Sequence, residues 1–314
     1  MASQGAPIPP VAATEELAAV GEAAGGAIPA GIPGRERADR IRRLIAYFVM
    51  FGVAALFAIP FLWSISTSLR PSAETVSGFS LLPHTWTTIG YHDMFHKYNF
   101  AQYTLNSAII AGAVTIANVF LATLGGYAFA RLRFPGREVL FLLVLGTLMI
   151  PDQLRLVPVY QMLVNILPGY VHTSLINRWG VILIQLVLAV NLFLMRQYFL
   201  TIPRDLEEAA KLDAAGYFKT YWRVMLPLAG PAVAAVAILT FQGIWNGLFW
   251  PAVLLQDRSQ YTIPIALAQF TQIYQTNWPP LMAASVLAIV PILVLFVVFQ
   301  RYFVAGVAAA GVKG

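Results

Sequence analysis

The chain has no cysteine and few charged residues for its length. The absence of cysteine excludes disulfide bonds, thiolate metal sites and cysteine nucleophiles. Charged residues make up 11% of the 314 residues, whereas soluble domains carry about 25%. So few charges cannot cover a water-facing surface, since 59% of the residues are hydrophobic and the mean hydropathy is +0.70. The composition therefore indicates an integral membrane protein.

Signals for metal, nucleotide and nucleic-acid binding are weak or missing. Among the four histidines, only His92 and His96 are four residues apart. A metal site would need further ligands, so we expect none. A phosphate-binding loop of the GxxxxGK[ST] type is absent, so we expect this chain to hold no catalytic residue and to hydrolyse no ATP. The net charge of +6 is interpreted as a signal of membrane orientation, and we expect no nucleic-acid partner.

Six apolar segments come close to the ~20 residues that a membrane helix requires, which predicts an all-α membrane protein with six transmembrane helices. These segments are Leu44–Ser66, Asn106–Ala130, Glu138–Leu163, Trp179–Tyr198, Leu228–Leu255 and Leu281–Phe303. The third is expected to run through a kink at Pro151. Residues 1–43, which are rich in Ala, Gly and Pro and end in a basic cluster, are expected to form a disordered tail. Residues 44–314 are expected to form the membrane domain.

Basic residues are distributed unequally between the two sides of the predicted membrane domain. With six crossings, fifteen of the twenty Lys and Arg residues fall on the side of the amino terminus. That side also holds the 131–137 turn, residues 199–227 and the carboxyl terminus. Because cytoplasmic loops carry the excess of Lys and Arg, we expect both termini and these loops to be cytoplasmic.

A charged, helix-forming segment at about 199–231, here called the 199–231 loop, separates the fourth and fifth spans. Acidic residues from Asp205 to Glu208 suit the first turn of a helix because they complement its dipole. Gly216 is expected to permit a turn before a second helix. The flat side expected to face a partner consists of Leu206, Ala209, Ala210 and Asp213. From periodicity alone, an amphipathic connector lying on lipid headgroups is an equal alternative.

The same segment resembles the cytoplasmic EAA loop of ABC importer permeases, which reads Glu-Ala-Ala, two residues, Asp-Gly-Ala and a later Leu-Pro. Here Glu208-Ala209-Ala210 is followed by Asp213, and Pro227 comes nineteen residues after Glu208. Ala214 stands where the motif has glycine, and Ala215 matches. Over nearly all of 44–314, the chain is similar to carbohydrate importer permeases of the kind represented by the smaller permease of maltose-type systems. The segments that carry this wider resemblance are NSAIIAG, GGYAFARLRFPGR, MIPDQLRLVPVYQML, FQGIWNGLFWP and GVKG.

The resemblance implies the type I ABC importer permease fold and an obligate assembly in the bacterial cytoplasmic membrane. The implied partners are a homologous second permease subunit, two cytoplasmic ATP-binding subunits and an extracytoplasmic solute-binding protein. ATP and Mg would be bound by the ATP-binding subunits, and no cofactor by this chain. Its implied function is the import of a sugar or oligosaccharide by alternating access. The implied ATPase-docking residues are Glu207, Glu208, Ala209, Ala210, Asp213, Ala214, Ala215, Gly216 and Pro227.

Polar residues inside the fifth span are candidates for the substrate pathway, because polar groups in a membrane are costly. Gln242 and Asn246 are four residues apart and share a helix face with amides suited to sugar hydroxyls. Trp245 could stack on a sugar ring. Hydrogen bonding between helices is an equal alternative for this group. Asn118, Gln185 and Asn191 are weaker candidates.

Two other functions compete with the sugar permease. A permease of the same superfamily could import a polyol or a glycerophosphate-type solute. A self-sufficient secondary transporter is a third hypothesis, although the spans show no inverted repeat and no charged residue at mid-span.

Overall fold

The computed structural model describes residues 35–75, 80, 82–166, 174–270 and 276–311, and no β-strand occurs among them. The prediction of an all-α protein is therefore confirmed. The chain divides into two compact units, residues 1–60 and 61–314. The expected tail of 1–34 lies outside the described residues, but the prediction of disorder up to residue 43 is wrong. Helix α2 (Arg35–Ser68) already begins at Arg35, because the segment RERADRIRR consists mainly of good helix formers.

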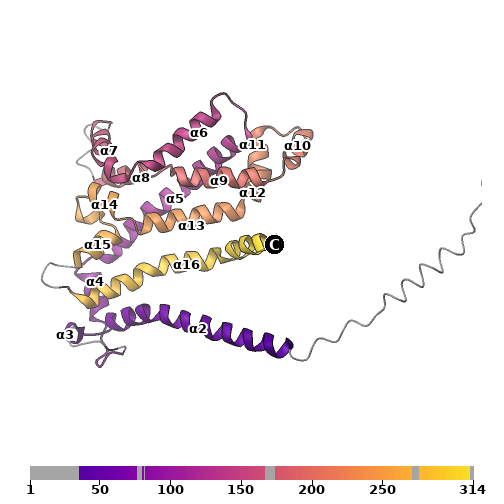
Figure 1. The fold of residues 1–314 in the computed structure, drawn as a ribbon. Helices are drawn as coiled ribbons and strands as arrows, with labels where there is room; N and C mark the ends of the chain where they lie inside the picture. Colours follow the sequence, from indigo (N-terminus) through magenta and orange to yellow (C-terminus); the bar gives the residue numbers. More distant parts are fainter. Residues whose placement is uncertain (1–34, 76–79, 81, 167–173, 271–275, 312–314) are drawn as a thin grey trace, which may run out of the picture. The chain divides into compact units, whose positions relative to one another are not determined.

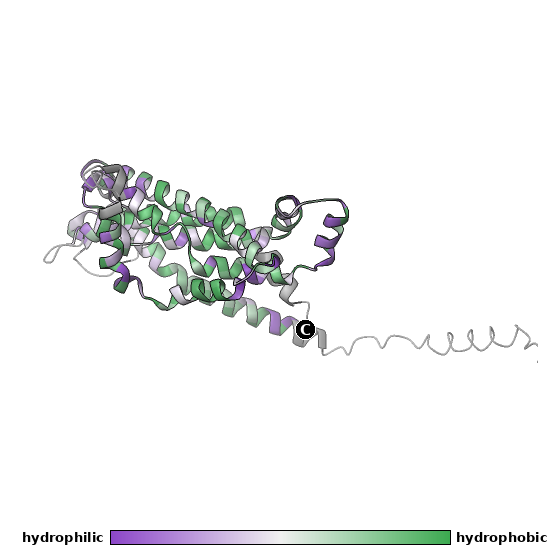
Figure 2. Ribbon diagram, turned by 90° about the horizontal axis from the view of Figure 1, so that it is seen from above, coloured by the Kyte–Doolittle hydropathy of each residue, from purple (hydrophilic) through white to green (hydrophobic). Residues whose placement is uncertain are grey.

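Four helices of the second unit run side by side (Figure 1) and form its centre. They are α5 (Phe100–Arg131), α9 (Ala189–Thr201), α13 (Gly230–Trp245) and α16 (Trp278–Gly311). Figure 2 shows apolar residues along these helices and hydrophilic residues concentrated at their two ends. This pattern is typical of helices that span a membrane.

Shorter elements gather at the two ends of this bundle (Figure 1). At one end lie α3 (Ser72–Thr75), α4 (Ile89–His96), α7 (Asp152–Ile166), α8 (Ser174–Leu183), α14 (Phe249–Leu254), η3 (Arg258–Gln260) and α15 (Ile263–Phe270). At the other end lie α10 (Asp205–Leu212), α11 (Tyr217–Thr220), the π-helix η2 (Tyr221–Met225) and α12 (Leu226–Leu228). The 199–231 loop therefore lies at one end of the bundle, opposite α7 and α15 (Figure 1).

Helices α5 and α9 pack closely because α5 presents glycine at the contact. A Cβ atom added at Gly126 would lie 2.6 Å from the Met195 Cβ and 2.9 Å from the Arg196 backbone nitrogen. Such close approach through small residues is common between membrane helices. Gly112 on the same helix has no neighbour within 4 Å of an added Cβ, so glycine permits close packing at Gly126 and not at Gly112.

Within the described part of the chain, three helices are long and apolar enough to cross a membrane, namely Arg40–Ser68, Phe100–Arg131 and Trp278–Gln300. They match the expected first, second and sixth spans. Two bent helix pairs would raise the count to five if each pair forms one span. The expected number of six therefore stays a prediction.

The third and fourth spans differ from expectation. The third does not continue through a kink at Pro151: α6 (Arg137–Gly146) and the short η1 (Thr147–Met149) are followed by a bend of 106° before α7. Proline cannot donate the next helical hydrogen bond and restricts the residue before it, and Ile150 is extended here. The fourth expected span consists of two helices, since α8 ends at Leu183 and α9 begins at Ala189.

The fifth expected span is shorter than predicted. Helix α13 covers Gly230–Trp245, and α14 follows as a separate helix. At its start, the segment Tyr217–Leu228 meets α13 at an angle of 78°. The second half of the 199–231 loop therefore lies across the end of α13, as expected for a segment that runs along a membrane surface.

Candidate functional site

Helix α10 has an inner and an outer side, and the two carry different chemistry. Glu207 and Ala210 face the bundle, with Ala210 8% exposed. Glu208 and Ala209 are exposed on the opposite side, and the Leu212 side chain beside them is 89% exposed. Together with the exposed Tyr217 and Phe218 of α11, Leu212 gives this end of the bundle several open apolar side chains, which favours a partner surface.

This geometry corrects the predicted contact face of α10. Ala210 was expected on the partner-facing side but packs inward, and Glu207 is also turned toward the bundle. Ala209 and Asp213 are exposed as expected. Sequence reasoning missed Leu212, although an isolated leucine among charged residues was a visible signal for an outward apolar contact.

The turn after α10 depends on Ala214 and not on Gly216. Ala214 has a φ of +54°, in the left-handed region that favours glycine. Gly216 precedes α11 with φ −69° and ψ 166°, a conformation open to any residue, so the expectation that Gly216 supplies the turn is wrong. Ala214 therefore occupies the strained position itself, at the place where the motif that the loop resembles has glycine.

A buried arginine fastens α10 to the bundle. The Arg131 side chain is 4% exposed, and its Nε lies 3.1 Å from Glu207 Oε1. This ion pair lacks the alignment of a hydrogen bond. The Arg131 guanidinium also donates to the carbonyl oxygens of Phe199 and Ile202, where α9 ends and its last carbonyls lack helical partners. Arg131 thus links the ends of three helices, α5, α9 and α10, a role that its place in a basic turn did not indicate.

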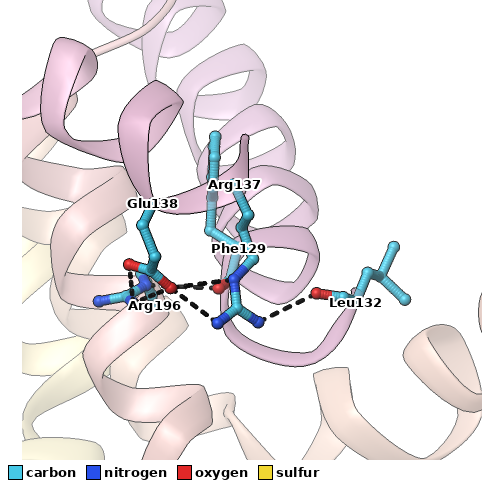
Figure 3. Close-up of polar contacts among 5 residues, drawn as sticks. All are labelled: Phe129, Leu132, Arg137, Glu138 and Arg196. Atoms are coloured by element: carbon cyan, nitrogen blue, oxygen red, sulfur yellow. Dashed lines mark hydrogen bonds and ion pairs between the residues drawn. The ribbon is translucent and has the colours of Figure 1, made fainter. Parts of the chain in front are cut away.

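The turn between α5 and α6 is held by a second set of ionic contacts (Figure 3). Glu138 pairs with Arg137 at 2.7 Å and with Arg196 of α9 at 3.2 Å. Arg137 also donates to the Leu132 carbonyl oxygen at 3.1 Å. Gly136 begins the new helix at φ +77°, a conformation that glycine adopts without steric cost. The 131–137 turn therefore has a fixed shape beside α10.

The second half of the 199–231 loop is anchored in the core. Tyr221 and Met225 of η2 are buried and belong to an apolar cluster with Tyr127 and Phe199. The Tyr221 hydroxyl is 2.9 Å from Thr123 Oγ1 of α5. Pro227 is exposed and lies just after η2. Contacts of this kind attach the loop to the bundle, in contrast to a connector that only lies on lipid headgroups.

The candidate pathway residues of α13 separate into two groups. Trp245 is 2% exposed, stacks on Phe241 and donates from Nε1 to the Ala288 carbonyl oxygen at 3.0 Å. It is therefore a packing residue, and its expected place on a sugar-stacking surface is wrong. Gln242 and Asn246 are exposed, and their side-chain amides form no hydrogen bond with any described residue. Unpaired amides are costly against lipid, so this face is suited to contact with water, a solute or another subunit.

Two of the weaker pathway candidates, Asn118 and Asn191, are joined in a buried polar network, whereas Gln185 donates to the Val181 carbonyl oxygen at 3.0 Å. Asn191 Nδ2 donates to Asn118 Oδ1 and Thr240 Oγ1, both at 2.7 Å. Asn118 Nδ2 in turn donates to the Leu186 carbonyl oxygen at 3.0 Å. The Asn118, Asn191 and Thr240 side chains are buried. They therefore serve to connect α5, α9 and α13 and are closed to a solute.

Among the described residues, no group of three or more His, Asp or Glu side chains could hold a metal ion. His92 and His96 stack their rings at 4.3 Å. Between them, Asp93 accepts a hydrogen bond from Lys97 at 2.8 Å, which holds the pKa of that carboxyl below its ordinary value. These side chains therefore pair with one another at the solvent-exposed end of α4.

Three comparisons with known proteins agree. Residues 118–309 match the family model described as binding-protein-dependent transport system inner membrane component. The chain is 36% identical to the arabinooligosaccharides transport system permease protein AraQ of Halalkalibacterium halodurans, over 83% of this chain and 93% of the relative. It is 32% identical to the diacetylchitobiose uptake system permease protein NgcG of Streptomyces coelicolor, over 84% of this chain and 86% of the relative.

The fold also matches a solved structure. A chain from the crystal structure of a bacterial ABC transporter involved in the import of the acidic polysaccharide alginate superposes with a TM-score of 0.72. The identity is 24%, and the match covers 85% of this chain and 98% of that chain. This likeness shows that the two chains share a fold.

Proposed function

Because the chain belongs to the binding-protein-dependent transport system inner membrane component family, we propose that it is the permease subunit of an ATP-driven importer for a sugar or oligosaccharide. Support for the solute class comes from relatives named for arabinooligosaccharide transport and diacetylchitobiose uptake. In this proposal a solute-binding protein delivers the solute outside the cytoplasmic membrane. A second permease subunit completes the pathway.

We further propose that α10 is the docking element for a cytoplasmic ATP-binding subunit. The observation that carries this proposal is the outer side of α10, where Glu208 and Ala209 flank the 89% exposed Leu212. An exposed apolar side chain beside a small residue and a carboxylate suits insertion into a protein cleft. ATP and Mg are then bound and used by the two partner subunits, and this chain contributes no catalytic residue.

Movement of α10 would reach the membrane helices by two routes. The first route is Arg131, which contacts Glu207 of α10 and the carbonyl end of α9. The second is the chain itself, through η2 and Pro227 into α13. Rigid attachments of this kind let a displacement at the cytoplasmic end tilt helices as bodies, which is the motion that alternating access requires.

The solute pathway is proposed to pass the exposed polar face of α13. Gln242 and Asn246 lie one helical turn apart, have no internal partner and can hydrogen-bond to sugar hydroxyls. Gly243 between them is exposed and carries no side chain, which leaves room for a bulky solute. Trp245 is excluded from this face by its burial.

A charge reversal on the outer side of α10 tests the docking proposal. Glu208→Lys should abolish solute uptake and coupled ATP hydrolysis in the assembled transporter, while the chain still inserts into membranes. The reason is that the Glu208 side chain is exposed and forms no hydrogen bond or ion pair with any described residue, so the change leaves the packing of the bundle intact. Lys219→Glu on α11, also exposed, is the matched control and should leave uptake near the wild-type rate.

Normal uptake by Glu208→Lys would count against docking through α10. Flux by the purified chain alone in liposomes, without ATP, would instead favour a secondary transporter. The solute class is tested separately by measuring binding of the cognate solute-binding protein to a panel of oligosaccharides, polyols and glycerol phosphates. Selective binding of a glycerol phosphate would refute the sugar assignment and leave the permease assignment intact.

A further inference from the structure

A basic cavity lies between the 131–137 turn and α10. Its volume is about 490 Å³. Five basic side chains line it, against the two carboxylates Glu207 and Glu208. The basic residues are Arg131, Arg133, Arg137, Arg204 and Lys211. This excess of positive charge in one concave surface favours an anionic ligand.

Only part of this positive charge is already neutralised inside the protein. Arg131 is paired with Glu207, and Arg137 with Glu138. Arg133, Arg204 and Lys211 are exposed and form no ion pair with any described residue. Three basic side chains, from the turn, from the residue before α10 and from its last turn, therefore converge on one cavity, where Glu208 alone among the lining residues is a carboxylate without an ion pair to a described residue.

The cavity continues onto an apolar helix surface. A second hollow of about 650 Å³ shares Arg133, Phe134, Arg137 and Arg204 with the first and reaches Val139 at the start of α6. Beyond it, α6 exposes Val139, Leu142 and Leu143 at 62%, 64% and 64%. Their spacing of three and four residues places them on one side of the helix.

Positive charge joined to an exposed apolar stripe is the surface that a lipid molecule fits. A phosphate group accepts charge-assisted hydrogen bonds from guanidinium and ammonium groups, and acyl chains pack on exposed Val and Leu. Basic pockets at the cytoplasmic ends of membrane helices bind anionic headgroups by this chemistry. A soluble anion would use the basic cavity but not the stripe on α6.

We propose that the cavity binds the phosphate headgroup of an anionic phospholipid, with its acyl chains along the exposed side of α6. Arg133, Arg204 and Lys211 contact the phosphate, and Arg131 and Arg137 shape the cavity wall through their own ion pairs. Because α10 supplies two of the residues, the lipid holds that helix against the 131–137 turn. This site does not depend on the transported solute or on ATP, so its test is independent of the proposed function.

The test measures lipid retention by the full chain. Wild type and the triple variant Arg133→Gln, Arg204→Gln, Lys211→Gln are stripped of lipid in a neutral detergent. Each is titrated with phosphatidylglycerol or phosphatidylcholine of identical acyl chains, and bound lipid is counted by native mass spectrometry. The triple variant should bind phosphatidylglycerol about 10- to 100-fold more weakly, with phosphatidylcholine binding unchanged.

A matched control removes the same charge elsewhere. Arg40→Gln, Arg42→Gln, Arg43→Gln on α2 takes three exposed basic residues and should change phosphatidylglycerol binding less than twofold. An equal loss in this control would show a general charge effect and overturn the site. Equal phosphatidylglycerol binding by wild type and the first triple variant would overturn it too.

Competition with inorganic phosphate distinguishes a phospholipid headgroup from a free phosphate ion as the ligand of the cavity. If the acyl chains contribute, phosphate at the same concentration as the lipid should displace almost none of it. Displacement at equal concentration would show that the cavity takes a soluble phosphate, and would overturn the lipid assignment. Unchanged thermal unfolding of the triple variant shows that it is folded, as expected from side chains that have no internal ion pair.

Discussion

At the scale of single residues, the backbone at Ala214 is the clearest source of strain near α10. An alanine at φ +54° costs about 1–2 kcal/mol relative to a right-handed conformation. Glycine adopts the same φ freely but loses more entropy on folding, about 0.5–1 kcal/mol. The net balance favours glycine in the folded protein.

Ala214→Gly is therefore expected to stabilise the chain by about 0.5–1 kcal/mol. The thermal unfolding midpoint of the purified protein in detergent is the measurement, and it should rise slightly. Gly216→Ala is the control: φ there is −69° and no atom lies within 4 Å of an added Cβ, so it should not lower the midpoint. A lower midpoint for Ala214→Gly would show that the left-handed turn is not the dominant strain.

The sequence predicted some site residues and not others for a physical reason. The position of α10 followed from its acidic first turn, and the exposure of Glu208 and Asp213 from their charge. Which side of a short helix faces inward depends on a distant partner, here Arg131 on α5. Trp245 was misjudged for the same reason, because the Ala288 carbonyl that accepts its hydrogen bond lies on another helix.

At the scale of elements, Gly126 determines how closely α5 and α9 approach each other. Gly126→Ala is expected to destabilise the protein by about 1–3 kcal/mol, because the new methyl group overlaps Met195 and the backbone of α9. Gly112→Ala on the same helix has open space around it and should be neutral or slightly stabilising. Thermal unfolding of the two variants compares them directly. Equal effects would mean that glycine's flexibility in α5 matters more than its size.

The apolar helices could be predicted from the sequence, but the interruptions within the third, fourth and fifth expected spans could not. Length and apolar content are local properties, so the first, second and sixth spans could be predicted. The interruption between α8 and α9 carries no proline or glycine between Leu183 and Ala189, and it is stabilised instead by the Asn118 amide, which donates to the Leu186 carbonyl. A break that depends on a side chain from another helix leaves no signal in its own segment.

At the scale of the whole molecule, the exposed polar face of α13 could line the solute pathway or pack against another subunit, and a double substitution distinguishes these two roles. Gln242→Leu with Asn246→Leu should lower solute uptake about tenfold, because two amides that meet sugar hydroxyls are lost. Folding should be unaffected, since neither amide has an internal partner. Transport assays on reconstituted transporter are the measurement, and Leu239→Ala, on the same exposed side, is the control.

Co-purification with the second permease subunit distinguishes the alternatives. The pathway assignment requires that the double variant still assembles while uptake falls. Loss of assembly would show that the amides pack between subunits. Unchanged uptake with normal assembly would remove both residues from the pathway.

The Arg131 contact has a mechanical consequence. If a helix is joined to its neighbours only through the backbone, its movement is transmitted through each connecting segment in turn. The most flexible of these segments then limits how much of the movement reaches the neighbouring helices. Arg131 adds a second link in parallel, from α10 to the carbonyl end of α9 and to α5 itself. Parallel links add their stiffnesses, so a displacement of the eight-residue α10 would move α5 and α9 together with α13.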